Sequence, residues 1–146
     1  MTTLNEILRE KAGSPLYAID QGANVLDAVQ MMNECSVGAL IVKNAGHMSG
    51  IFTERDVLRR VLGKRLDPAS VQVAQVMTEQ VICCTPATSI EEARELMRSR
   101  RIRHLPILDA EGEAVGVVSI GDLNAHLTTH QEVTIHYLHE YLHGRV

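Results

Sequence analysis

The chain is poor in aromatic residues, with no Trp, one Phe and three Tyr among 146 residues. Its core must therefore be built from Val, Ile, Leu, Met and Ala side chains. No apolar run approaches the roughly 20 residues that a membrane-spanning helix needs. The N-terminus also lacks the apolar stretch of a secretory signal peptide. These absences predict a cytoplasmic protein that has no contact with a membrane.

Positive charge and cysteine are also limited. The formal net charge is −4, from 14 Lys and Arg against 18 Asp and Glu. This balance argues against nonspecific nucleic-acid binding, which needs clustered positive charge. Cys35, Cys83 and Cys84 do not have the spacing of a disulfide framework. We therefore interpret them as reduced thiols, which fits a cytoplasmic location.

The sequence contains none of the common catalytic motifs. We find no Gly-x-Ser-x-Gly, no Walker loop and no Cys-x-x-Cys. The protein is therefore predicted not to be an enzyme and to need no metal. A small enzyme that acts on a nucleotide stays open as an alternative.

Two segments of the chain are nearly the same. Residues 50–56 read Gly-Ile-Phe-Thr-Glu-Arg-Asp, and residues 116–122 read Gly-Val-Val-Ser-Ile-Gly-Asp, 66 positions later. Each is typical of a strand that passes through a hydroxyl residue into a helix. Further pairs lie 65 residues apart: Ala28 with Ala93, Met32 with Met97, and Leu40 with Leu105. The chain is therefore predicted to hold two copies of one supersecondary unit.

Periodicity and turn residues predict an α/β (α+β) fold in which each copy follows the order strand, helix, strand, strand, helix. The second copy is expected to begin with a strand over 81–84. The predicted parts are listed here in chain order: a leading helix over 1–14, a first repeat over 15–66, a junction over 67–78, a second repeat over 79–128, and a C-terminal helix over 129–146.

The two repeated corners have a structural and a functional interpretation. Thr53 with Asp56, and Ser119 with Asp122, place a hydroxyl at a helix N-cap and an acidic residue at the third helical position, which forms a capping box. A helix N-terminus also favours a phosphate. A carboxylate one turn into the helix can accept both hydroxyls of a ribose. The two roles are compatible, so both pairs are candidate ligand contacts.

Basic side chains near the second repeat are candidate phosphate contacts. Arg103 and His104 fall on a predicted strand, where alternation directs them to opposite faces. Arg103 is the first choice because a guanidinium can hold a phosphate with two hydrogen bonds, and His104 is the second. Arg55 is the third, because its position in the first turn of a helix is unfavourable unless an anion lies nearby.

The chain resembles a pair of CBS domains, the module named after cystathionine β-synthase. The resemblance rests on the two corners, on Val76-Met77-Thr78 at the junction, and on Arg103-His104-Leu105-Pro106-Ile107 on a strand. It spans about residues 15–128. It implies two repeats packed by pseudo-twofold symmetry, with extra helices at both ends, and a disc-like homodimer.

The resemblance also implies a ligand and its surroundings. Members of this family bind adenine nucleotides in clefts between their repeats: AMP, ADP, ATP, NAD(H) or S-adenosylmethionine. The implied base contacts are the first strand of each repeat and the residues after it: Tyr17, Ala18, Ile19, Thr85 and Pro86. Gly38 and Ala39 would leave room for a ring. They stand where the second repeat has Arg103 and His104, so one dominant site per chain is expected.

These observations predict a stand-alone regulatory module that senses an adenine nucleotide, AMP before NAD(H) or ATP, and signals as a homodimer to an unknown effector protein. Two other classes stay open. One is a structural dimerisation module that binds no ligand. The other is a metal-responsive protein that uses His136, His139 and His143, which would share one helical face.

Overall fold

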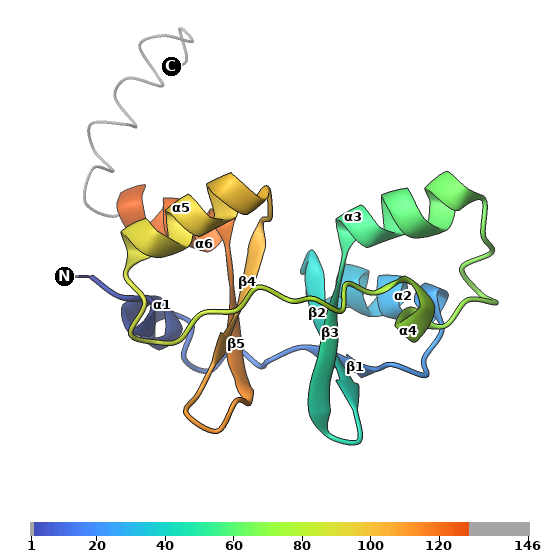
Figure 1. The fold of residues 1–146 in the computed structure, drawn as a ribbon, viewed down its shortest axis with the longest axis horizontal. Coiled ribbons are helices and arrows are strands. Elements are labelled where there is room, and N and C mark those ends of the chain that lie inside the picture. The colour runs from blue at the N-terminus through green and yellow to red at the C-terminus, as the bar shows by residue number, and fades with distance from the viewer. Residues whose placement is uncertain (1, 129–146) are drawn as a thin grey trace, which may run out of the picture.

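The structure is a computed structural model, and it describes residues 2–128. Two similar halves lie side by side (Figure 1). The first half contains β1 (Ala18–Asp20), α2 (Val25–Cys35), β2 (Ala39–Asn44), β3 (His47–Thr53), and a helical segment made of α3 (Glu54–Asp56), η1 (Val57–Val61) and η2 (Leu62–Lys64). The second contains α5 (Ile90–Arg100), β4 (His104–Leu108), β5 (Ala114–Ser119) and α6 (Ile120–Thr128). The mixed α/β class is confirmed, and the predicted helix over 129–146 lies outside the described residues.

The two sheets differ in size. In the first, β1 pairs in parallel with β2, and β2 pairs antiparallel with β3. In the second, β4 and β5 form a two-stranded antiparallel ladder. The predicted strand over 81–84 is wrong, because this segment makes only one bridge, between Cys84 and Ile107. The chain leaves the sheet at once because Thr85 and Pro86 open a turn, which Thr88 closes through its backbone N–H to the Thr85 carbonyl.

Each half has its own aliphatic core. Leu40 and its repeat partner Leu105 are fully buried, one in each core, and so are Ala28 and Ala93. Phe52, the only Phe, is fully buried in the first core. Equivalent positions therefore serve equivalent packing roles, as the repeat predicts.

The leading helix α1 (Leu4–Glu10) belongs structurally to the second half. Leu4 and Ile7 are buried in the second core, and α1 contacts β5 and α6. Its counterpart in the first half is α4 (Val73–Val76), which packs on β3. The residue just before each of these helices makes an equivalent antiparallel β-bridge: Thr3 pairs with Ser89, and Gln72 pairs with Asn24. Each half is thus completed by a helix from outside its own repeat.

Two equivalent glycines allow these helices to approach the sheets. A Cβ at Gly50 would lie 2.7 Å from Met77 Sδ and from the Thr78 carbonyl oxygen. A Cβ at Gly116 would lie 2.6 Å from Leu8 Cδ2. At Gly50 the Thr78 carbonyl is backbone and cannot move aside, so glycine is required there, whereas at Gly116 the flexible end of Leu8 could shift to make room. The α4 segment and α1 therefore occupy corresponding places against the two halves.

Candidate functional site

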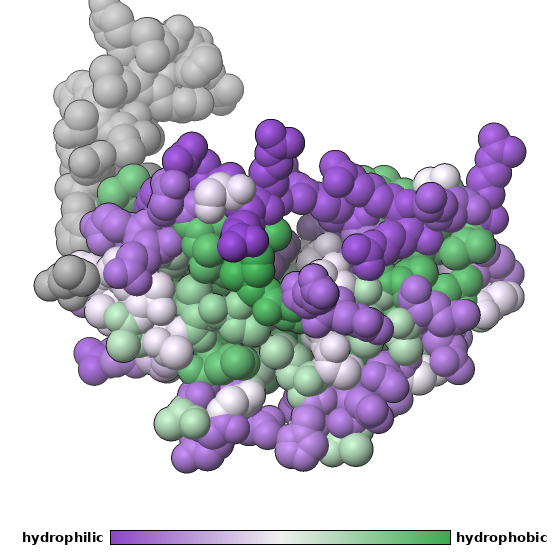
Figure 2. Space-filling view, viewed as in Figure 1, coloured by the Kyte–Doolittle hydropathy of each residue, from purple (hydrophilic) through white to green (hydrophobic). Residues whose placement is uncertain are grey.

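A cleft of about 480 Å³ lies between the two halves. Residues from both repeats and from the chain that joins them line it: Ile51, Thr53, Glu54, Arg55, Asp56, Leu58, Arg59, Arg60, Thr78, Gln80, Val81, Ile82, Ile102, Arg103 and His104. Its volume lies in the range typical of small-molecule sites. The space-filling view shows hydrophilic residues along the upper edge of both halves and a hydrophobic area below them (Figure 2).

Thr53 and Asp56 form the first corner, and they line the cleft. The Thr53 hydroxyl accepts from the Asp56 backbone N–H at 3.4 Å, and Asp56 Oδ2 accepts from the Thr53 backbone N–H at 3.0 Å. The expected capping box is therefore present. Asp56 also accepts from the Thr78 hydroxyl at 3.2 Å and lies 3.6 Å from Arg60 Nε. Although it lines the cleft, Asp56 is only 4% exposed.

Four arginines line the cleft, three from the segment after Thr53 and Arg103 from the other repeat. Arg55 donates across the halves to the Arg101 carbonyl, and Arg60 donates to the Met77 carbonyl at 2.8 Å. Within residues 2–128, neither Arg59 nor Arg103 has an acidic partner. Among the described lining residues, the acidic side chains are Glu54 and Asp56. The cleft therefore has an excess of positive charge, which attracts anions.

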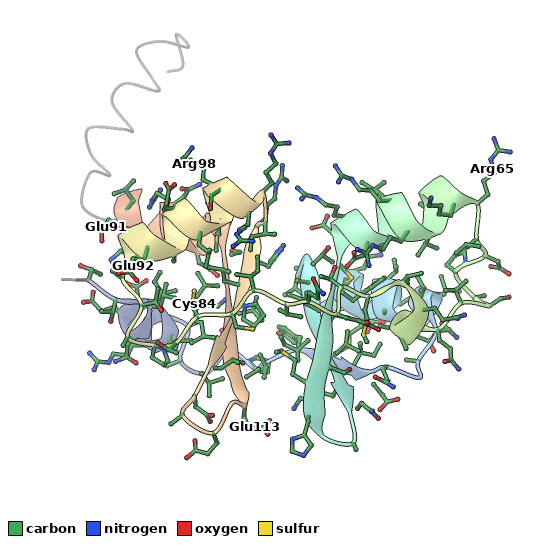
Figure 3. All side chains as sticks on the ribbon, viewed as in Figure 1. Arg65, Cys84, Glu91, Glu92, Arg98 and Glu113 are labelled. Carbon is green, nitrogen blue, oxygen red and sulfur yellow. The ribbon has the colours of Figure 1, made fainter. Side chains whose placement is uncertain are left out.

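This charge is part of a wider asymmetry. Ten of the 14 Lys and Arg residues lie in two segments, 55–65 and 94–103, although the chain is acidic overall. Arg65 and Arg98, one from each segment, point to the same edge of the molecule (Figure 3). Glu91 and Glu92 lie in the first turn of α5 (Figure 3), whereas Arg103 follows the end of this helix in a bend just before β4, not on the strand as predicted. Positive charge is thus concentrated along the edge where the cleft lies.

His104 lies where the two repeats meet. A Cβ at Gly38, in the first repeat, would come within 3.3 Å of His104 Cε1 and would collide with the Glu54 carboxylate. Burial lowers the pKa of His104, and this effect outweighs the opposing attraction of Glu54 and Asp122. The imidazole is therefore neutral at pH 7 and offers a hydrogen bond to the cleft rather than a charge.

The other residues proposed from the sequence lie elsewhere. Tyr17, Ala18 and Ile19 belong to the β1 region of the first sheet, and Ala39 is buried at the start of β2. None of these four is among the cleft-lining residues, and Gly38 lines a separate groove beside α2. The Pro86 carbonyl accepts from the Asn5 backbone N–H at 3.0 Å, so Thr85 and Pro86 adjoin α1 rather than the cleft.

Sequence reasoning did not select several lining residues. The apolar wall is formed by Ile51, Val81, Ile82 and Ile102. Thr78 belongs to the junction motif, and its contact with Asp56 spans 22 residues, so no local pattern links the two. Arg60 could have been found, because it stands four residues after Asp56, a spacing at which side chains meet on a helix.

Ser119 and Asp122 form the second corner, and they do not line the cleft. Asp122 Oδ2 accepts from the Ser119 backbone N–H at 2.8 Å, and the Ser119 hydroxyl accepts from the Asp122 N–H at 3.0 Å. Lys11, just after α1, donates to Asp122 Oδ2 at 2.9 Å and to the Val117 carbonyl at 2.8 Å. Burial raises the pKa of Asp122, but the Ser119 and Lys11 hydrogen bonds outweigh it and hold that pKa below its usual value.

This shift predicts a pH-dependent stability. A carboxylate whose folded pKa is depressed contributes stability above its unfolded pKa, about 3.9, and loses it as the pH falls through the folded value. Asp122→Asn should therefore lower the free energy of unfolding by about 1 kcal/mol at pH 7. The gap to the wild type should shrink as the pH falls below about 4. Urea unfolding of both proteins at pH 7 and at lower pH checks this, and a gap that stays constant would contradict it.

Two other features are absent from residues 2–128. No group of three or more His, Cys, Asp or Glu side chains could hold a metal ion there. His136, His139 and His143 lie outside the described residues. Over the same range, none of the helices combines the length and the apolar character that crossing a bilayer requires.

Fold and site together define a class: two intertwined α/β repeats with a cationic cleft between them. Comparison with known proteins gives the same class. The family model for the CBS domain matches residues 4–63 and 73–128. The chain is 34% identical over 152 residues to the mitochondrial CBS domain-containing protein CBSX3 of Arabidopsis thaliana, a match that covers 98% of this chain and 73% of that protein. The chain belongs to the CBS-domain family, whose members are regulatory and signal-transduction modules.

Solved structures show the same architecture. A protein with CBS domains from Burkholderia ambifaria has a TM-score of 0.82 and 36% identity, over 88% of this chain and 95% of that one. A hexameric CBS-CP12 protein from bloom-forming cyanobacteria has a TM-score of 0.74 and 26% identity, over 84% of this chain and 69% of that one. The pair of CBS repeats that the sequence predicts is therefore confirmed.

Proposed function

We propose that this protein is a regulatory module that senses an adenine nucleotide, AMP before ATP or NAD(H), in the cleft between its repeats. One observation carries the proposal. The buried carboxylate of Asp56, from the first repeat, and the guanidinium of Arg103, from the second, line the same cleft. A ligand that has both a diol and a phosphate would contact the two repeats at once.

The lining residues suggest how such a ligand would lie. The phosphate would meet Arg103 and Arg59, which have no acidic partner within the described residues. The base would lie against Ile82 and Ile102, with hydrogen bonds from the backbone. The ribose would have to take the place of the Thr78 hydroxyl or of Arg60 Nε beside Asp56.

That exchange offers a route from binding to signalling. Arg60 also holds the Met77 carbonyl, so its displacement by the ribose would free the junction after α4. A ligand shifts a conformational equilibrium only through its different affinity for the two states. In this proposal the junction differs between the free and the ligand-bound state. The signal would be a change in the geometry of a homodimer or in the surface that an effector protein contacts. The hexameric CBS-CP12 relative supports assembly of the fold, and we place the protein in the cytoplasm.

One observation favours a second candidate, a structural module without a ligand. Asp56 already has protein partners in Thr53, Thr78 and Arg60, so its role is complete without a ribose. This candidate predicts that nucleotides change nothing.

Thermal melting separates the two candidates. A ligand that binds only the native state stabilises it, by about 2.7 kcal/mol at a concentration 100 times its Kd. We expect AMP, ATP or NADH to raise the midpoint, and inorganic phosphate alone to raise it much less. If none of the three nucleotides moves the midpoint, the structural candidate replaces the sensing role. Native mass spectrometry of gently purified protein would then show the bound molecule and the oligomer directly.

A further inference from the structure

The two corners are equivalent by repeat but differ in what touches their carboxylates. At the first corner, the Thr78 hydroxyl donates to Asp56, while the Thr78 backbone exchanges hydrogen bonds with Ile51 in both directions. At the second corner, Lys11 Nζ donates both to Asp122 and to the Val117 carbonyl. Val117 is the repeat partner of Ile51, 66 residues on. One ammonium therefore takes over two contacts that Thr78 makes with its hydroxyl and its backbone N–H.

The length of the preceding helix explains the difference. α4 ends at Val76, so the chain turns early and Thr78 can pair with β3 as extended backbone. α1 runs from Leu4 to Glu10, and Lys11 still follows it as the helix cap. The Lys11 backbone N–H donates to the Ile7 carbonyl, so it is not available to the strand. Only the long Lys11 side chain can reach the Val117 carbonyl from there.

The side chains around the second corner also differ from those of the first. The repeat partners of Arg55, Arg59 and Arg103 are Gly121, Ala125 and Gly38. The second corner therefore lacks the arginines that make the first attractive to a phosphate. Lys11 supplies the positive charge at the second corner instead. Its side chain is 39% exposed, and that of Asp122 is 27% exposed.

We propose that Lys11 acts as an intramolecular occupant of the second corner, which holds Asp122 closed to a ribose and limits the chain to one nucleotide. This rests on the proposed function of the first corner. The ammonium takes Oδ2 of Asp122, and a diol would need both carboxylate oxygens. It is tethered to a helix buried in the second core, so its effective concentration at Asp122 is high. The second corner, freed of Lys11, would bind through the ribose and base alone, without preference for a phosphate.

Counting bound ligand tests this. Lys11→Thr copies the residue found at the first corner. Isothermal titration with AMP should give one site per chain for the wild type and two for Lys11→Thr. Arg9→Thr is the matched control, because it removes the same charge from the exposed face of the same helix and should keep one site. In the double variant Lys11→Thr with Asp56→Asn, the remaining site should bind adenosine and AMP with affinities within about threefold of each other, since the repeat partners of Arg55, Arg59 and Arg103 carry no charge there.

Several results would overturn the proposal. Two AMP molecules on the wild type would show that Lys11 closes nothing. A wild type that binds one AMP, together with a Lys11→Thr variant that gains no second site, would do the same. A wild type that binds none of AMP, ATP and NADH refutes the sensing role instead, so the two failures are distinct. Should Lys11→Thr melt too early to be studied, Lys11→Met preserves the aliphatic stem and Lys11→Arg keeps the charge, with two sites and one site expected.

Discussion

Asp56→Asn is expected to weaken AMP binding by about 10- to 100-fold, the cost of losing a charge-assisted hydrogen bond to a ribose diol. Asn keeps the size of the side chain and one oxygen that can accept from the Thr53 backbone N–H, as Asp56 does at 3.0 Å. It loses the charge and the second acceptor that a diol requires. Asn is preferable to Ala here, because Asp56 is 4% exposed and Ala would leave buried donors without a partner.

Asp122→Asn provides the matched control for this experiment. It makes the same chemical change at the equivalent capping box, at a corner that does not line the cleft. Titration of both variants with AMP should show a large loss for Asp56→Asn and less than about a twofold change for Asp122→Asn. Equal affinities in the wild type and both variants would remove Asp56 as a ribose ligand.

Arg103→Gln is expected to lower AMP affinity by about tenfold or more and to leave adenosine affinity almost unchanged. The reason is that an arginine–phosphate contact is charge-assisted, typically with two hydrogen bonds, whereas adenosine has no phosphate to lose. Arg103 enters the cleft from the repeat opposite Asp56, and it has no acidic partner within residues 2–128. Titrations with AMP and with adenosine, run in parallel, measure the difference.

Arg98→Gln serves as the charge control for Arg103. Arg98 is already paired with Glu95 at 2.7 Å, its side chain is 75% exposed, and it is not among the lining residues of the cleft. Its removal should change AMP affinity by less than about twofold at physiological salt, where exposed charges are screened. If Arg103→Gln weakened AMP and adenosine by the same factor, Arg103 would act on the shape of the cleft and not on the phosphate. If Arg98→Gln lost as much AMP affinity as Arg103→Gln, the arginines would act through long-range electrostatic attraction and not through direct contact with the phosphate.

The sequence by itself determined the repeat, the fold class and the two capping corners. These depend on local patterns: the 66-residue spacing of Asp56 and Asp122, apolar periodicity, and a hydroxyl three residues before a carboxylate. Local backbone geometry needs only neighbouring residues, so a single sequence carries the information. The strand predicted over 81–84 is wrong, because a strand there depends on how many ladder partners the sheet offers, which no local pattern records.

The tertiary structure alone decided which corner faces the cleft and what its neighbours are. Arg103 joins the Thr53 corner of the other repeat, and Gln80 to Ile82 line the cleft, whereas Tyr17 to Ile19 are not among its lining residues. Lys11 meets Asp122 across 111 residues, because α1 packs on the second half although it begins the chain. These contacts follow from how the halves exchange helices, and that exchange is fixed by packing between distant segments rather than by any run of neighbouring residues.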